Sequence, residues 1–453
     1  MAEKGASSSD YGRGAAILTV GIGITGLVTF AFLAVASNLL SKAQYGQLAL
    51  LWSAVFLITP IFYRPVEQLM ARTIAERRTR DQELLGPLRI AAVIQLALGA
   101  LFAVVALVFR GRITDGLFDG NSTLYWIMFS SVLAYAVSYF GRGLLAGFQR
   151  FGLYGLLVFI EATVRFMFPV VVLIGLADGQ DVIAFGILAG PVISLFVVPA
   201  ALLGRQASVV GDDPLAAAEH AVEEMETLDV ASGAVDVERT DFTLSEGGGF
   251  AAAALVIMAC EQTILNAAPF IANSTAGGAA AAAMVVNILL IARAPMQLFQ
   301  SVATSLLPHL SSLRATEDFK TYRRSVRLTL LAIAGAAGFG AIVMAAIGPW
   351  LMQTVLGEEY VYGRLGLVAV TLGMGLYLCA ATLNQSALAA GRVRAAVACW
   401  LTATVAFVVW LLLPLHDSAL TRVEIGYPAS ALLLFALLFG LYEKSTPRDF
   451  SGE

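Results

Sequence analysis

The segment I-F-Y-R-P-V-E-Q-L (residues 61–69) places Arg64 inside an apolar stretch, and L-I-A-R-A-P-M-Q-L (residues 290–298) does the same with Arg293 half a chain later. In both copies a glutamine follows the arginine by four residues, and a proline lies beside it. An arginine at the centre of a membrane helix costs about 2.5–3.5 kcal/mol on insertion scales. Two arginines kept at repeat-related positions therefore predict a duplicated membrane fold with an anion-binding interior.

The composition predicts an all-α polytopic membrane protein. Hydrophobic residues make up 58% of the 453 residues and charged residues 13%, with a mean hydropathy of +0.80, which excludes an ordinary soluble domain. Apolar stretches long enough to cross about 30 Å of hydrocarbon recur along the chain. We predict twelve transmembrane helices, at residues 14–38, 46–71, 88–109, 123–147, 153–177, 182–203, 249–272, 277–306, 326–350, 363–390, 394–415 and 425–442.

One long polar segment divides the predicted helices into two sets of six. It holds eleven acidic residues and two arginines, which indicates a solvated acidic linker on the cytoplasmic side rather than a binding module. The predicted organisation is an N-terminal lobe at residues 1–203, the linker at 204–248 and a C-terminal lobe at 249–453.

The ends of corresponding helices support the duplication. The fourth predicted helix exits through G-L-L-A-G-F-Q-R (residues 143–150), and the tenth through Q-S-A-L-A-A-G-R (residues 385–392). Six helices in each lobe give both lobes the same orientation in the membrane. Transporters built from such parallel repeats hold the substrate between lobes and rock them for alternating access.

The distribution of lysine and arginine predicts that both termini are cytoplasmic. Of 28 such residues, 20 fall on the side of the N-terminus, five fall in the loops opposite, and three lie within spans. Arg142 and Arg150 are assigned to the cytoplasmic side, whereas Arg110, Arg112 and Arg422 are assigned to outer loops. The first apolar segment is too long for a signal-peptide core and is expected to be a retained helix.

Sequence motifs of nucleotide-binding sites, metalloproteases and metal sites are absent or lie in a context where they cannot have that role. A G-x-G-x-x-G at residues 21–26 falls inside the first membrane helix without a preceding strand, so it does not indicate a dinucleotide site. There is no Walker A sequence, no H-E-x-x-H, and no spaced Cys/His cluster, and the three cysteines lie within predicted helices. We therefore expect no enzyme, no cofactor, no metal and no nucleic-acid partner.

Ionisable groups within the predicted helices are the candidate functional residues, because charged side chains there seldom face lipid. They are Arg64, Glu67, Glu161, Arg165, Glu261 and Arg293. These groups could have a structural or a functional role, and both interpretations remain open. Arg64 and Glu67 are three residues apart, and Glu161 and Arg165 are four apart, so the two members of each pair could neutralise each other in a purely structural role. The remaining two groups lack a same-helix partner at this spacing.

Those two groups, Glu261 and Arg293, could pair across helices or act separately. A guanidinium suits phosphate because its planar fork donates two hydrogen bonds while staying charged. Arg293 is therefore predicted to contact an anionic substrate, and Glu261 is predicted to be a proton or cation site.

Several stretches resemble a known family. They are N-L-L-S-K-A-Q-Y-G (residues 38–46), R-G-L-L-A-G-F-Q-R-F-G-L-Y-G (residues 142–155) followed by Glu161 and Arg165, and the region from Glu261 through R-A-P-M-Q-L to L-L-P-H-L (residues 306–310). They resemble the polysaccharide-biosynthesis branch of the multidrug/oligosaccharidyl-lipid/polysaccharide exporter superfamily, which is related to the multidrug and toxin extrusion (MATE) proteins. The acidic linker departs from the family pattern.

The resemblance implies a V-shaped fold of two six-helix lobes around a central cavity, and movement of polyprenyl-linked sugar phosphates between membrane leaflets. Cavity arginines of the family are thought to meet the pyrophosphate. Carried over, this assigns substrate binding to Arg64, Arg165 and Arg293, and we assign ion coupling to Glu161 and Glu261.

The predicted function is a flippase that exports a lipid-linked (polyprenyl phosphate) oligosaccharide or polysaccharide precursor across the cytoplasmic membrane without ATP. Membrane lipids are the other expected partners, and a proton or sodium gradient or the membrane potential would drive transport. The alternative is a cation-coupled drug antiporter, which should favour acids over arginines in its cavity. A membrane enzyme is disfavoured because no sizeable outer loop is available for catalytic groups.

Overall fold

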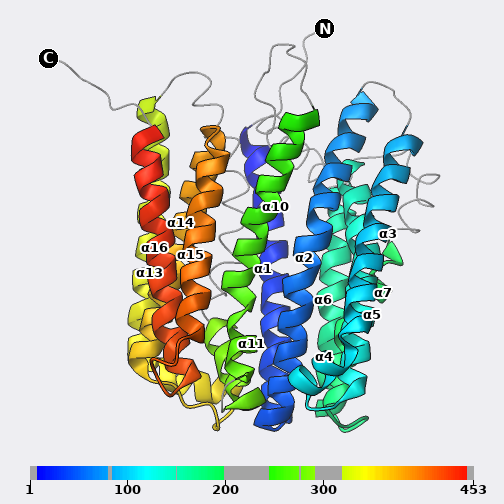
Figure 1. Cartoon of the computed structure of the whole chain (residues 1–453), viewed down its shortest axis with the longest axis vertical. Coiled ribbons are helices and arrows are strands. Elements are labelled where there is room, and N and C mark those ends of the chain that lie inside the picture. The colour runs from blue at the N-terminus through cyan, green and yellow to red at the C-terminus, as the bar shows by residue number, and fades with distance from the viewer. Residues whose placement is uncertain are drawn as a thin grey trace, which may run out of the picture. The chain divides into compact units, whose positions relative to one another are not determined.

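The computed structural model describes residues 8–79, 84–148, 150–197, 244–274, 277–290 and 319–445. Within these ranges every regular element is a helix (Figure 1). The chain forms two compact units, Met1–Thr227 and Leu228–Glu453, each with its own packing. The predicted all-α polytopic fold is confirmed, whereas the 204–248 linker lies almost wholly outside the described residues.

The first unit contains seven described helices. They are α1 (Ser8–Leu39), α2 (Lys42–Thr79), α3 (Leu85–Val108), α4 (Arg110–Phe118), α5 (Ser122–Gly147), α6 (Phe151–Leu173) and α7 (Gln180–Ser194). The second unit is described by α10 (Leu244–Asn266), α11 (Ala268–Asn273), a helix over Gly278–Leu290, α13 (Phe319–Leu356), α14 (Arg364–Ala389), α15 (Val393–Leu412) and α16 (Ala419–Ser445).

Eight of these helices are long and apolar enough to cross a membrane, and four shorter apolar helices accompany them in the described chain. The shorter ones are Ile24–Leu39, Gln180–Ser194, Ala253–Asn266 and Gly278–Leu290. Together they fall on the twelve predicted helices, so the chain is a multi-pass membrane protein. Residues 291–306, the second half of the eighth predicted helix, lie outside the described residues.

The structure differs from the prediction at three places. The outer segment after α3 was expected to be a loop but forms α4, a nine-residue helix whose two glycines hid its helical character. The seventh predicted helix is divided into α10 and α11 at Ala267, because Pro269 occupies the N-terminal turn of α11. Arg422 lies inside α16, where it is buried and donates from Nη1 to the Leu411 carbonyl at 3.1 Å, rather than in an outer loop.

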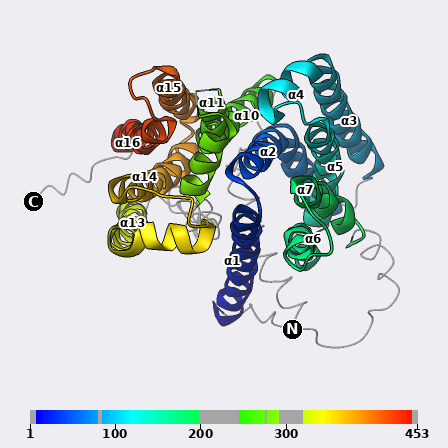
Figure 2. The ribbon, with the colours of Figure 1, turned by 90° about the horizontal axis from the view of Figure 1, so that it is seen from below.

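Packing within the first unit brings α2, α5, α6 and α7 together. Helix α5 packs against both α2 and α7, and α7 also packs along α6. Figure 2 shows α7 beside α5 and α6 when the unit is seen end-on. Helix α3 packs against α2 and α5. A side chain on the inner face of α5 is therefore enclosed by helices on several sides.

Packing within the second unit is centred on α14, which lies against α13 and α16. Helix α15 in turn packs against α16 and α10. The core of the second unit is formed by large side chains such as Tyr377, Trp400 and Tyr427, each almost completely buried. Helix α5 in the first unit and α14 in the second are thus each packed between two other helices.

Candidate functional site

Glu161 on α6 is the centre of a buried charge cluster in the first unit. Its Oε1 accepts hydrogen bonds from the Tyr135 hydroxyl at 2.7 Å and from Arg165 Nη2 at 2.9 Å. Its Oε2 accepts from Arg142 Nη2 at 2.5 Å and from Ser138 Oγ at 3.4 Å. Only 4% of Glu161 is exposed. Four donors around one carboxylate satisfy a charge that would otherwise be very costly to bury.

The two arginines are held by aromatic rings as well as by the carboxylate. Arg165 Nη2 also donates to the Tyr135 hydroxyl at 2.7 Å, and its Cζ lies 5.0 Å from the Trp52 ring centre and 5.3 Å from that of Phe56. Arg142 Cζ lies 4.8 Å from the centre of the Tyr139 ring. Cation–π contacts of this kind strengthen where water is excluded. Both guanidinium groups are therefore fixed in position.

Helical spacing explains why these residues meet. Tyr135, Ser138 and Arg142 are three and four residues apart, so they share one face of α5. Glu161 and Arg165 are four apart on α6 and form an ion pair with each other. The predicted pairing within α6 is thus present.

A second buried acid belongs to the same unit. Glu67 on α2 is 9% exposed, and its Oε1 accepts a hydrogen bond from the Tyr154 hydroxyl on α6 at 3.0 Å. Arg64, one turn earlier on α2, has an exposed side chain. The first unit therefore has an acid–phenol contact between α2 and α6 in addition to the Glu161 cluster.

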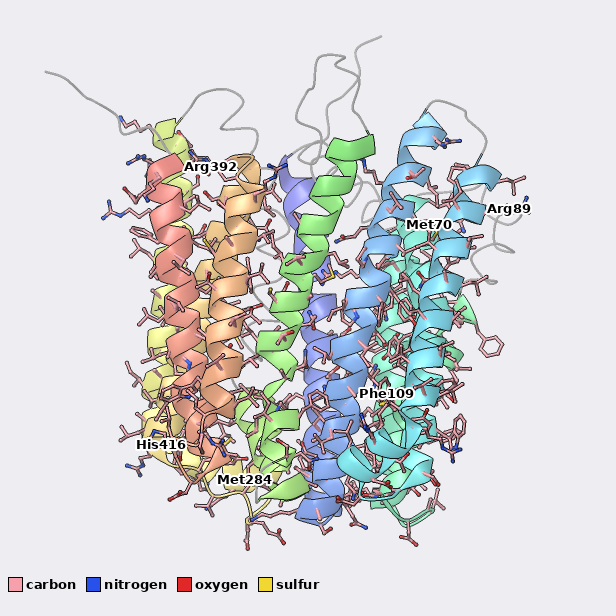
Figure 3. All side chains as sticks on the ribbon, viewed as in Figure 1. Met70, Arg89, Phe109, Met284, Arg392 and His416 are labelled. Carbon is pink, nitrogen blue, oxygen red and sulfur yellow. The ribbon has the colours of Figure 1, made fainter. Side chains whose placement is uncertain are left out.

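Glycine pairs allow the helices to approach closely at the acids. A Cβ added to Gly143 on α5 would lie 2.8 Å from Met70 Cε and 3.0 Å from the Glu67 carbonyl oxygen, and Gly147 faces Ile74 in the same way. Met70 is labelled on α2 in Figure 3. On α7, a Cβ on Gly190 would lie 2.8 Å from the Glu161 carbonyl oxygen. Larger side chains at these positions would push apart the helices that carry the cluster.

The cluster has a surplus of positive charge and of hydrogen-bond donors. Two guanidinium groups face one carboxylate, so Arg142, Glu161 and Arg165 carry a net charge of +1. Among the described residues, the Nε–H groups of both arginines are buried without a hydrogen-bond acceptor. The buried carboxylate of Glu67, whose charge also acts on Arg142, offsets this surplus, so the two Nε–H donors without acceptors are what favours an additional anion.

The structure brings together only some of the predicted site residues. Glu161 and Arg165 are in direct contact, and Arg64 lies elsewhere on α2 in the same unit. Glu261 is half-buried on α10 in the second unit. Arg293 lies outside the described residues. The functional roles assigned to these five residues stay predictions.

Arg142 is the residue of this cluster that the sequence analysis places wrongly. It was assigned to the cytoplasmic rim because it precedes the exit motif of the fourth helix, but it lies within α5, is 9% exposed and pairs with Glu161. The spacing of Tyr135, Ser138 and Arg142 along one helix face was the available signal. Its acidic partner is 19 residues away on another helix, and no sequence spacing reveals such a pair.

In the second unit, neutral hydrogen bonds join α14 to α13 and to α15. Trp400 Nε1 on α15 donates to Asn384 Oδ1 on α14 at 3.0 Å. The hydroxyls of Tyr322 on α13 and Ser386 on α14 are 2.6 Å apart. These bonds link adjacent helices without burying a formal charge.

Comparison with known proteins supports the resemblance seen in the sequence. Residues 11–218 match the family described as "Polysaccharide biosynthesis protein". None of the curated proteins matches the sequence significantly.

Among solved structures, the chain is similar to an inward-facing multidrug resistance MATE family transporter of the MOP superfamily, with 12% identity, a TM-score of 0.64, and coverage of 95% of this chain and 97% of that one. A point mutant of the Vibrio cholerae MATE transporter VcmN gives 16% identity, a TM-score of 0.62, and coverage of 96% and 97%. This chain has the MATE fold. Together with the family match, the fold confirms the predicted resemblance to the polysaccharide branch of the MATE-like exporters.

The family match covers less than half of this chain. The similar structures are transporters, and that this chain catalyses no reaction stays a prediction. Because their sequence identities are low, these structures establish the fold and leave the substrate to be argued from the residues of this chain.

Proposed function

We propose that this protein is a flippase that moves a lipid-linked oligosaccharide or polysaccharide precursor across the cytoplasmic membrane by alternating access. The observation that carries the proposal is the polysaccharide-biosynthesis match over residues 11–218, a stretch that also contains the Glu161 cluster. Both termini would be cytoplasmic, and the polyprenyl tail would stay in lipid while the head group crosses.

The charge of the cluster fits a phosphate-bearing head group. Arg142 and Arg165 outnumber Glu161, and each has an Nε–H donor without an acceptor among the described residues. Phosphate oxygens accept bidentate hydrogen bonds from guanidinium groups. Arg64 and Arg293 would complete the set of arginines that contact the head group during transport.

The same geometry supports a coupling role for Glu161. While ionised, its carboxylate occupies Arg142 and Arg165, so it competes with any anion for them. Protonation of Glu161 would remove the competing charge and free both guanidinium groups. Entry of a proton would then favour binding of the phosphate, and Glu261 would be the corresponding ion site in the second unit.

A cation-coupled drug antiporter is the second candidate, because the similar solved structures include a multidrug resistance MATE transporter. The buried Nε–H groups of Arg142 and Arg165 can only donate hydrogen bonds, which suits an anion and weighs against an organic cation.

Deletion of the gene tests the proposal. We expect surface glycan to be lost and its lipid-linked precursor to accumulate inside the cell, with drug susceptibility unchanged. Intact glycan export would overturn the proposal, and raised drug susceptibility with intact export would establish the antiporter instead.

The arginine assignment needs its own experiment. Arg293→Lys and Arg293→Ala are compared for glycan export at matched protein levels, and we expect Ala to abolish export and Lys to retain part of it. If both variants export normally, Arg293 does not contact the substrate.

A further inference from the structure

Helix α4 lies where the first unit leaves the hydrocarbon. The 24-residue α3 is about 36 Å long at 1.5 Å per residue, which is enough to cross about 30 Å of hydrocarbon. Phe109, labelled in Figure 3, follows directly after α3. Helix α4 and the first turn of α5 therefore lie at a boundary between membrane and water.

Two arginines at this boundary rest on aromatic rings. Arg110 Cζ lies 5.1 Å from the Trp126 ring centre and 5.9 Å from that of Tyr125, and Arg112 Cζ lies 6.0 Å from the Phe109 ring centre. Both arginines are exposed, as are Phe109 and Trp126. These five residues form what we call the α4 patch.

The patch is held in place by buried groups. Phe118 is fully buried at the end of α4, and Asp119 ends the helix in the left-handed region, with φ of 48°. Asp119 Oδ2 accepts a hydrogen bond from Gln47 Nε2 on α2 at 3.0 Å. The Tyr125 hydroxyl donates to the Ala106 carbonyl on α3 at 2.8 Å. The Tyr125 ring is thus fixed to α3, and the end of α4 is fixed to α2.

An exposed apolar surface continues from the patch along α3. Val108 is 72% exposed and Leu107 is 49% exposed, beside Phe109. Such a surface on a membrane helix faces acyl chains, and aromatic rings next to it are typical of the interface with head groups. Helix α4 carries Arg110, Arg112 and the exposed Asp115, so its net charge is +1. Positive charge beside an acyl-facing surface complements the phosphate of an anionic lipid.

We propose that the α4 patch binds the phosphate group of an anionic phospholipid, with Arg110 and Arg112 contacting the phosphate and the rings of Phe109 and Trp126 lying at the level of the glycerol backbone. The bound lipid anchors this end of the first unit at one depth in the membrane. The patch is separate from the Glu161 cluster and acts on bilayer lipid rather than on the transported substrate.

Lipid binding to the purified full chain tests this proposal without a transport assay. Native mass spectrometry of the detergent-solubilised protein measures binding of added phosphatidylglycerol and phosphatidylcholine. We expect R110Q/R112Q to lower the apparent affinity of the tightest phosphatidylglycerol site roughly tenfold and to leave phosphatidylcholine binding unchanged. R110K/R112K should retain most of the affinity because it keeps both charges.

Arg364→Gln is the matched control, since Arg364 is an exposed arginine at the start of α14 in the second unit. Wild-type affinity in R110Q/R112Q, or an equal loss in the Arg364→Gln variant, would overturn the proposal.

A second measurement reports the depth of the patch. The wild type and Trp126→Phe are compared in vesicles whose phosphatidylglycerol carries bromine near the head group. The difference between their fluorescence is the contribution of Trp126, and we expect this contribution to be quenched. If that fluorescence is not quenched, Trp126 does not lie among lipids and the proposal fails.

Discussion

The two units join corresponding helices by different chemistry. The duplication predicted from the exit motifs at residues 143–150 and 385–392 would give Arg142 on α5 and Asn384 on α14 corresponding places. Arg142 forms an ion pair with Glu161 on the next helix, whereas Asn384 accepts a neutral hydrogen bond from Trp400 on its next helix. A duplicated helix pair can thus be joined with or without buried charge.

The difference between the Arg142–Glu161 and Asn384–Trp400 contacts shows that buried charge can do more than hold two helices together. A neutral hydrogen bond links two helices with a small desolvation cost, whereas buried ion pairs seldom add net stability. The first unit nevertheless keeps Arg142, Arg165 and Glu161 together, and the Nε–H groups of both arginines lack an acceptor among the described residues, which suits an anion. The contact between α14 and α15 in the second unit contains no such charged group.

Arg142→Met should cause the largest loss of stability. It leaves Glu161 buried with Arg165 as its remaining cation, and removal of one partner from a buried pair costs about 3–5 kcal/mol. Thermal unfolding of the detergent-solubilised protein measures the loss. A stability equal to that of the wild type would show that the ion pair is dispensable for the fold and would remove the contrast with Asn384.

The double variant Arg142→Met/Glu161→Leu should be more stable than the sum of the two single variants predicts. Both charges of the Arg142–Glu161 pair are removed together, so Arg165 alone loses its carboxylate, and the coupling should be about 0.5–3 kcal/mol. The four proteins of this double-mutant cycle are compared by the same unfolding experiment. Additive effects would mean that the two side chains do not act as a pair.

Gly190→Ala should separate α7 from α6 at the cluster. The new Cβ would meet the Glu161 carbonyl oxygen at 2.8 Å, and overpacking of this kind costs about 1–3 kcal/mol. Gly155→Ala is the control on α6, because nothing lies within 4 Å of a Cβ added there. Equal melting temperatures for the two variants would contradict the close contact.

Asn384→Ala should have the smallest effect, about 1 kcal/mol, because it removes one neutral hydrogen bond. Glycan export should continue in this variant, whereas we expect it to fail in Arg142→Met at matched protein levels. Loss of export from both variants would show that the two contacts have the same importance for transport.

The helices of this fold could be predicted because hydropathy over about 20 residues is a strong local signal. The ion pair between Glu161 and Arg165 could also be predicted from the sequence, since both residues lie on one helix. Arg142 could not be assigned from sequence, because its partner is on another helix and its neighbours resemble an exit motif. Helix α4 was missed because R-G-R-I-T-D-G-L-F contains two glycines and no long apolar face.

The contact between Arg142 and Glu161 also limits which substitutions the two positions can accept during evolution. A lineage that replaced either residue alone would carry an unbalanced charge inside the unit, and selection would remove it or favour a second replacement. The two positions should therefore change together across related sequences, and an asparagine at position 142 should be accompanied by a neutral residue at position 161. The second unit already carries asparagine at the corresponding position.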